Sequence, residues 1–259
     1  MKMFKRTVAL IPAQHEMLQL GTSTDWRFCA DELLMPLACN EMADAAREYP
    51  LVFLKDQSLF YTLLGFEQAV NAYVAEDGHW RAHYVPARLR AYPFALAPVP
   101  ETADQFALVM DADAPQLQQT EGEPLFVQGQ PGPALKARIA LLQAMAKADP
   151  TTRRMVQAIR SAGLLVARAV QVRQPSPERP ALGGFEVIDE QKLNALPDDA
   201  FAALRKAGAL PLVYAHLLSM ANLRQGPLAG KYPELSAAAS QRQPAQSMDA
   251  LLAGLHRAG

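Results

Sequence analysis

The hydrophobic period of the chain changes near Pro133, and this change constrains the fold more than any other feature. Before it, short aromatic and β-branched runs at 51–55, 61–66 and 71–75 are separated by turn residues, which is typical of antiparallel strands. After it, apolar residues recur at helical spacing. Strands followed by helices predict an α+β fold in which helices pack on an antiparallel sheet.

Prolines bound further elements of the first half. A β-branched run at 7–11 stops at Pro12 and predicts a strand, and a helix-compatible stretch at 36–49 stops at Pro50. The runs 94–97 and 106–110 are joined by a polar, proline-bearing connection. They predict one more hairpin on the same sheet.

The second half predicts several helices and a pair of strands. One helix starts at Pro133, and a second is expected from Pro150 to a stop at Gly163. A strand at 164–172 and a return strand at 183–188 follow. Helices at 197–208 and 211–224 come next, and the last of these is apolar almost all round, so we expect it to be buried.

The composition favours one sizeable domain with a tail. Half of the 259 residues are apolar, enough for a soluble globular protein with its own core. We expect a single main domain over residues 1–225. Residues 226–246 are rich in small and polar residues and predict a flexible linker. Residues 247–259 predict a short amphipathic docking helix, with Met248, Leu251, Leu252 and Leu255 on one face.

Charge and hydropathy exclude several classes of partner. The formal net charge is −1, so bulk electrostatics favour neither nucleic acid nor an acidic membrane surface. No segment approaches the ~18 consecutive apolar residues of a membrane span. The N-terminal apolar run is broken at Pro12 before it reaches the length of an export signal, so we expect a cytoplasmic protein. Cys29 and Cys39 lack a CxxC pattern, so we expect two buried thiols in a reducing compartment.

The segment 78–94 is the richest candidate recognition surface. Its seventeen residues hold four aromatics, three arginines, two of the five histidines and no carboxylate. Aromatic rings and guanidinium groups together suit an anionic or planar ligand. The candidate ligand-binding residues are Trp80, His83, Tyr84, Arg88, Arg90 and Tyr92. The alternative is that the rings fill the core while the arginines pair with six carboxylates at 101–123.

No complete catalytic or metal motif accompanies this segment. The nucleophile elbow, the P-loop and the dinucleotide fingerprint are all absent, so no catalytic residue and no cofactor are predicted. His79 and His83 have the i, i+4 spacing of a metal pair, but Gly78 and Pro86 argue against a continuous helix and no metal site is predicted. His216, on the apolar helix, is expected to be a hydrogen-bonded core histidine.

Several separated blocks of the chain resemble the bacterial SapC family. They are YPLVFLKD at 49–56, Trp80 with YVPARLRAYPF at 84–94, EGEPLF at 121–126, GF at 184–185, LNAL at 193–196 and YAHLLS at 214–219. The resemblance runs from about the N-terminus to Arg224. The resemblance implies a link to surface-layer biology. It also implies a gene that lies near genes for TonB-dependent receptors, flavin-dependent tryptophan halogenases and iron-dependent hydroxylases, as is often found in this family. The family has no agreed catalytic residues, so none is carried over.

We therefore expect a non-enzymatic binding or accessory protein of surface-layer or envelope-associated systems. Its ligand would be a small anionic, aromatic or peptide molecule bound by the arginine and aromatic segment, and the C-terminal helix could recruit a protein partner. The alternative is an enzyme, or the partner of one, in oxidative modification of amino acids or peptides. His79, His83 and Glu121 are the residues to test for that role.

Overall fold

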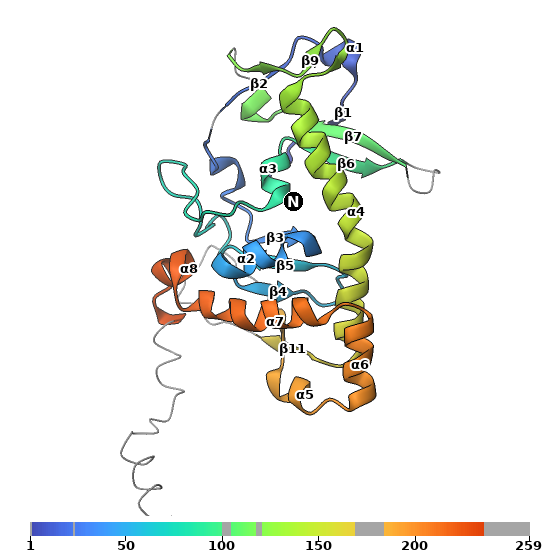
Figure 1. Cartoon of the computed structure of the whole chain (residues 1–259). Helices are drawn as coiled ribbons and strands as arrows, with labels where there is room; N and C mark the ends of the chain where they lie inside the picture. Colours follow the sequence, from blue (N-terminus) through green and yellow to red (C-terminus); the bar gives the residue numbers. More distant parts are fainter. Residues whose placement is uncertain (1, 23, 100–104, 118–120, 169–183, 236–259) are drawn as a thin grey trace, which may run out of the picture.

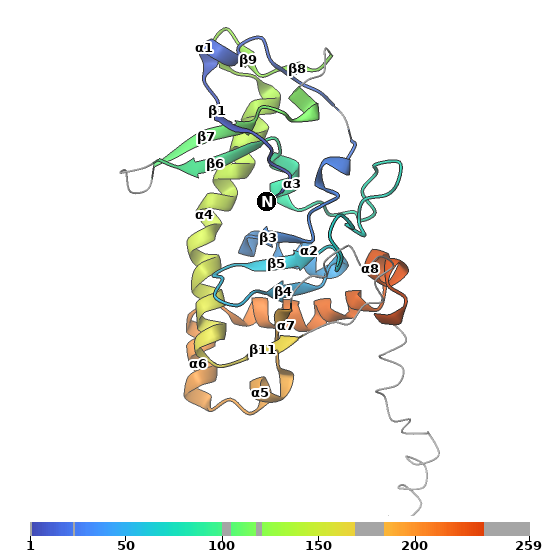
Figure 2. The same ribbon diagram turned by 180° about the vertical axis from the view of Figure 1, so that it is seen from behind.

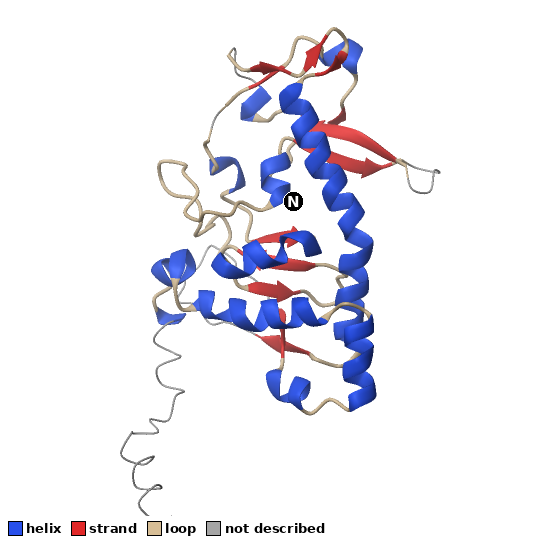
Figure 3. Ribbon diagram, viewed as in Figure 1, coloured by secondary structure: helices blue, strands red, loops and turns tan. Residues whose placement is uncertain are grey.

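A long helix connects two antiparallel sheets in the computed structural model, which describes residues 2–22, 24–99, 105–117, 121–168 and 184–235. The helix, α4 (Pro133–Ser161), runs along one side of both sheets (Figure 1). Helices and antiparallel strands are mixed throughout (Figure 3), so the expected α+β class is confirmed.

The larger sheet has five strands in the order β11-β12-β4-β5-β3. The hairpin of β4 (Leu51–Phe53) and β5 (Phe60–Leu63) forms as the sequence predicts. The predicted return strand is also confirmed, because β11 (Leu165–Arg168) pairs antiparallel with β12 (Phe185–Ile188). The other edge is β3 (Leu34–Leu37), which lies where a helix was expected to begin. The helix of that stretch, α2 (Met42–Glu48), starts later, after a 3-10 turn at Cys39–Glu41.

The smaller sheet has the order β1-β7-β6. The predicted hairpin of β6 (Phe94–Pro98) and β7 (Phe106–Asp111) is present. The expectation that this hairpin extends the larger sheet is wrong, because β6 and β7 form a separate sheet in which β7 also pairs with β1 (Thr7–Ala9). Residues 71–75 do not form a strand either. They fold into turns, with a single bridge between Val74 and Trp80.

Short helices cover the sheets and fill the connections. Helices α2 and α7 (Leu210–Ser219) lie on one face of the larger sheet, as the two opposite views show (Figures 1 and 2). Other helical segments are α1 (Pro12–His15), η1 (Arg27–Cys29), α3 (Ala87–Ala91), η3 (Pro115–Leu117), α5 (Glu190–Asn194), α6 (Asp198–Lys206) and η4 (Met220–Leu223). Two short strand pairs join β2 (Gln19–Leu20) to β8 (Glu123–Pro124) and β9 (Phe126–Val127) to β10 (Gln130–Pro131).

Helix α4 is one helix, not the two that were expected. It continues through Pro150, which lies inside it and is exposed. The buried stripe runs on both sides of the proline, with Leu142 and Met145 before it and Val156 and Ile159 after it. Burial of such side chains contributes ~1.5–3 kcal/mol each, which outweighs the ~3 kcal/mol cost of an interior proline.

The C-terminal part differs from expectation at two places. Helix α7 is not fully buried, because Leu218 is 77% and Tyr214 48% exposed. Residues 226–231 form helix α8 (Gly226–Lys231) rather than the start of a linker. Leu228 and Tyr232 are buried, and the Tyr232 hydroxyl accepts the N–H of Phe66. The remaining expected linker, 236–246, and the expected helix at 247–259 lie outside the described residues.

His216 is a core histidine, as predicted. Its Nε2 accepts the N–H of Ile188 at 3.0 Å, and its Nδ1 lies 2.8 Å from the carbonyl oxygen of Leu51. The ring therefore joins α7 to both β12 and β4. Desolvation lowers its pKa from 6.5 to about 4, so the neutral tautomer that donates from Nδ1 persists at neutral pH. In the part of the chain that the structure describes, no helix is long and apolar enough to span a bilayer.

Candidate ligand-binding site

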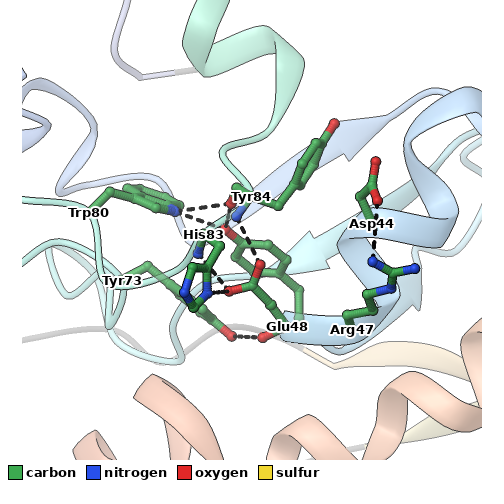
Figure 4. A network of polar contacts seen from close by, with 8 residues as sticks. Asp44, Arg47, Glu48, Tyr73, Trp80, His83 and Tyr84 are labelled. Atoms are coloured by element: carbon green, nitrogen blue, oxygen red, sulfur yellow. Dashed lines mark hydrogen bonds and ion pairs between the residues drawn. The ribbon is translucent and has the colours of Figure 1, made fainter.

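Two glutamates of one short region fix the loop that carries the aromatic segment. The Glu48 carboxylate accepts the N–H groups of His83 at 2.7 Å and Tyr84 at 2.8 Å (Figure 4). The buried Glu41 carboxylate accepts the Tyr84 hydroxyl at 2.8 Å and the Ala87 N–H at 2.7 Å. Carboxylates accepting several donors hold a loop firmly, so the start of α3 is positioned by these two acids.

Trp80 belongs to the core rather than to a surface. Its indole Nε1 donates to the Tyr49 hydroxyl at 2.8 Å, and that hydroxyl donates to the Tyr84 carbonyl. Its ring stacks on Tyr73, whose hydroxyl donates to the Glu48 carbonyl at 2.9 Å. Burial raises the pKa of both tyrosines, which keeps their hydroxyls protonated as donors. Trp80 thus supports the segment from beneath.

The candidate metal residues do not come together. His83 points into solvent, with Nδ1 3.4 Å from Glu48, and His79 contacts Asp77 at 2.6 Å (Figure 4 shows His83). Glu121 is exposed. Within the described ranges, no group of three or more His, Cys, Asp or Glu side chains could hold a metal ion, so His79, His83 and Glu121 form no such site.

Helix α3 places its two arginines at different levels of α4. Arg88 faces Asp149, whereas Arg90 lines a hollow together with Arg138. Residues 138 and 149 are separated by about 16 Å along the helix axis at 1.5 Å per residue. The guanidinium groups of Arg88 and Arg90 therefore line two separate depressions.

The depression at Arg88, which we call the Arg88 groove, has a volume of about 480 Å³. Its apolar walls come from β6, β7, α4 and the N-terminus, and its charged rim is formed by Arg88, Asp149 and Arg153. The larger apolar side chains are Phe4, Phe94, Leu96, Phe106, Leu142 and Met145. Apolar walls with a few convergent charges are typical of small-molecule sites.

The charges in the Arg88 groove are incompletely paired. Arg88 Nη2 lies 4.0 Å from Asp149 Oδ2, at the outer limit of an ion pair. Arg88 Nε and Asp149 Oδ1 are both buried and have no hydrogen-bond partner among the described residues. A buried donor or acceptor without a partner costs ~1–3 kcal/mol. A ligand that satisfied either atom would recover that free energy.

The acidic stretch at 101–123 does not neutralise these arginines in its described part. Asp111 instead accepts the N–H groups of Lys5 and Arg6 and the Tyr92 hydroxyl, and Asp113 pairs with Arg6 at 2.9 Å. Burial alone would raise the pKa of Asp111, but the hydrogen bonds from Arg6, Lys5 and Tyr92 outweigh it and keep that pKa below its usual value. These acids therefore anchor the N-terminus and leave Arg88 and Arg90 to other contacts.

Arg90 and Tyr92 lie on the opposite side of α3 from the Arg88 groove. Arg90 Nε donates to the Val85 carbonyl at 2.9 Å, and the guanidinium carbon is 5.5 Å from the centre of the Tyr84 ring. Tyr92 stacks on Phe28, with ring centres 4.3 Å apart. Of the six predicted residues, the structure thus places Arg88 at one hollow, Arg90 and Tyr92 at another, Tyr84 beside Arg90, His83 in solvent and Trp80 in the core.

Sequence reasoning missed the charged partners on α4. Arg138 and Asp149 fall on the apolar stripe of that helix, three residues after Leu135 and four after Met145. A charged residue in a buried stripe signals a partner or a ligand, and that signal was present in the sequence. Glu41 and Glu48 were missed too, because their partners lie more than thirty residues away.

A larger hollow of about 650 Å³ lies elsewhere, between α5, α6 and α7. Its walls include the exposed Tyr214 and Leu218, and its charged residues are Glu190 and Asp198. None of the described residues that line it is basic. An anionic ligand therefore fits the Arg88 groove better than this larger hollow.

Comparison with known proteins gives one match. The family model described as SapC matches residues 10–225, a range that includes the aromatic segment, α3 and α4. No curated protein and no solved structure matches the chain.

Proposed function

The chain belongs to the SapC family, and from this premise we propose that it is a non-enzymatic binding or accessory protein of surface-layer or envelope-associated systems. Its ligand is a small molecule or peptide end that combines an anionic group with an aromatic or apolar part. The Arg88 groove binds it. The observation that carries this proposal is the buried Arg88 Nε, which has no partner among the described residues and lies beside an apolar hollow.

The chemistry of the groove determines which ligands fit. A carboxylate on the ligand would accept from Arg88, and a hydrogen bond to a charged group contributes ~1.5–3 kcal/mol. Phe94, Leu142 and Met145 would cover an aromatic ring, since they form the apolar wall beside the guanidinium group. Asp149 can accept an N–H of the same ligand, which extends the proposal to peptides and amino-acid derivatives.

Phenylacetate is a suitable first probe because it joins a ring to a carboxylate. We expect calorimetric titration to show binding of phenylacetate and at least tenfold weaker binding of 2-phenylethanol, its neutral counterpart. Arg88→Met should weaken phenylacetate binding by at least tenfold. The matched control is Arg154→Met on α4, because Arg154 is exposed and lies outside the groove, with a hydrogen bond to Thr151 at 3.5 Å. Equal binding of the neutral compound, or an equal loss in both variants, would contradict the proposal.

A protein partner is the second part of this proposal. The amphipathic sequence at 247–259 supports it, with four apolar residues at helical spacing. Deletion of residues 240–259 should abolish capture of the partner and leave phenylacetate binding unchanged. Capture that persists after the deletion would remove this part of the proposal without affecting the Arg88 groove.

A further inference from the structure

Arg138 is a half-buried cation that forms no ion pair with any of the described residues. It projects from the first turns of α4 and, within the described ranges, makes no hydrogen bond and no ion pair. Its Nε is buried and unpartnered. Burial lowers the pKa of Arg138, the positive charge of Arg90 lowers it further, and Glu123 offsets this only in part. Two guanidinium groups that repel each other in a partly desolvated environment lower the stability of the folded state unless an anionic group lies between them.

The space beside the two arginines can hold such a group. Arg90 and Arg138 line a hollow of about 40 Å³, walled by the rings of Trp26, Phe28 and Tyr92. Asp25 lies at its edge, but the guanidinium group of Arg27 donates to both oxygens of that carboxylate, at 3.0 Å to Oδ1 and 2.9 Å to Oδ2. The hollow is thus net positive, and it is too small for more than a few atoms.

A third polar side chain ends in the same hollow. Gln116 is buried, and its Oε1 has no hydrogen-bond partner among the described residues. The oxygen and nitrogen of an amide are distinguished by their hydrogen bonds, so the amide can turn its NH₂ group inward toward an acceptor. Three donor-bearing side chains from separate elements then line one hollow.

We propose that Arg90, Arg138 and Gln116 form a second site, which binds a compact oxyanion such as a phosphate or carboxylate group. Arginine forks suit both groups because each offers paired oxygen acceptors. The aromatic walls exclude larger chemical groups. The anion therefore binds as a free ion or as the end group of a longer molecule whose remainder lies outside the hollow. This site is lined by other residues than the Arg88 groove, so the two proposals are tested separately.

Inorganic phosphate is the first probe, with acetate as the carboxylate arm. Thermal unfolding is followed in increasing sodium phosphate or sodium acetate, with ionic strength held constant by sodium chloride. Phosphate should raise the midpoint of the wild-type protein by several degrees in a saturable manner, because a ligand that binds only the folded state stabilises it. A larger rise with acetate that Arg138→Met abolishes and Arg88→Met retains would assign the site to carboxylates instead.

Matched arginine substitutions locate the effect. Arg138→Met keeps the apolar stem and should abolish the rise, whereas Arg88→Met should retain it. Without added anion, Arg138→Met should be at least as stable as the wild type, because it removes an unpaired buried charge. If Arg138→Met does not fold, Arg138→Lys should fold and show at least tenfold weaker phosphate binding.

Other outcomes overturn the site. An absent rise in the wild type with both anions would show that the hollow binds neither. An equal rise in Arg138→Met would show a general salt effect, and a rise lost equally in Arg88→Met would place the anion in the Arg88 groove.

Discussion

Arg88 and Asp149 face each other at 4.0 Å between α3 and α4, and each keeps one buried polar atom without a partner among the described residues. A structural ion pair would be closer and better satisfied, because desolvating two charges is repaid only by good geometry. The arrangement instead resembles a ligand-binding site, in which a bound ligand satisfies the unpaired polar atoms of both residues. The two residues should therefore respond in opposite directions to substitution.

Asp149→Asn should strengthen the binding of anions in the Arg88 groove. Removing the carboxylate leaves the Arg88 charge uncompensated, so phenylacetate should bind severalfold more tightly, while Arg88→Met should bind at least tenfold more weakly. Neither should change the free energy of unfolding by more than about 1 kcal/mol, because a loose, partly exposed pair contributes little. Calorimetric titration and urea unfolding measure both quantities. Weaker phenylacetate binding by Asp149→Asn would be inconsistent with this account.

Glu41 should be important for stability although it lies at the end of a short helical turn. Its buried carboxylate accepts from Ala38 N, Ala87 N and the Tyr84 hydroxyl. Glu41→Gln replaces an acceptor with a donor and should lower the free energy of unfolding by about 2–4 kcal/mol. The control is Asp44→Asn, because Asp44 makes only an exposed pair with Arg47 at 3.9 Å (Figure 4) and should change stability by less than about 0.5 kcal/mol. Urea unfolding that ranked the two variants equally would refute this role.

His216 should make the protein less stable in mild acid. The pKa of this residue is lowered from 6.5 to about 4 in the folded chain, mainly by desolvation. Between pH 6.5 and 4, His216 is protonated in the unfolded chain and neutral in the folded chain. The free energy of unfolding therefore falls as the pH falls. The slope from this one residue is at most about 1.4 kcal/mol per pH unit.

His216→Gln should flatten this pH dependence between pH 6.5 and 4, although the variant itself is less stable. The exposed His83 supplies the control, since His83→Gln should leave the slope in place. Urea unfolding at half-unit pH intervals would show the difference, and an unchanged slope in His216→Gln would disprove the assignment.

Pro150 should destabilise α4 slightly. It lies inside the helix, lacks the N–H that would bond to residue 146, and is exposed to solvent. Pro150→Ala should therefore raise the thermal midpoint, with a gain of about 1–3 kcal/mol. A lower midpoint would mean that the proline serves the packing of α4 in a way that its exposure does not indicate.

Local patterns in the sequence were sufficient for much of the fold. The hairpin of β4 and β5 and the pairing of β11 with β12 depend on neighbouring runs of apolar residues separated by turns, so their periodicity reveals them. The continuity of α4 could not be predicted this way. Pro150 is a strong local stop signal, and only the tertiary burial of residues on both sides of it overrides that signal.

The arginine segment could be singled out from composition, but not its partners. Arg88 faces Asp149 and Arg90 lies near Arg138, and both partners are on α4, some fifty to sixty residues later in the chain. The spacing of residues 80–94 contains no information about them. Trp80 was grouped with the arginines because it is near them in sequence. Its hydrogen bond to Tyr49 places it in the core instead. The acidic stretch was a plausible partner on sequence proximity alone, yet Asp111 and Asp113 hold the N-terminal strand.

The most direct test of the central claim is the position of a bound anion. Crystals of the full chain soaked in 4-bromophenylacetate would reveal the ring through the anomalous scattering of bromine. The account predicts a bromine peak between Phe94 and Leu142, with the carboxylate within hydrogen-bond distance of Arg88. A peak in the hollow between α5, α6 and α7, with the Arg88 groove empty, would contradict it.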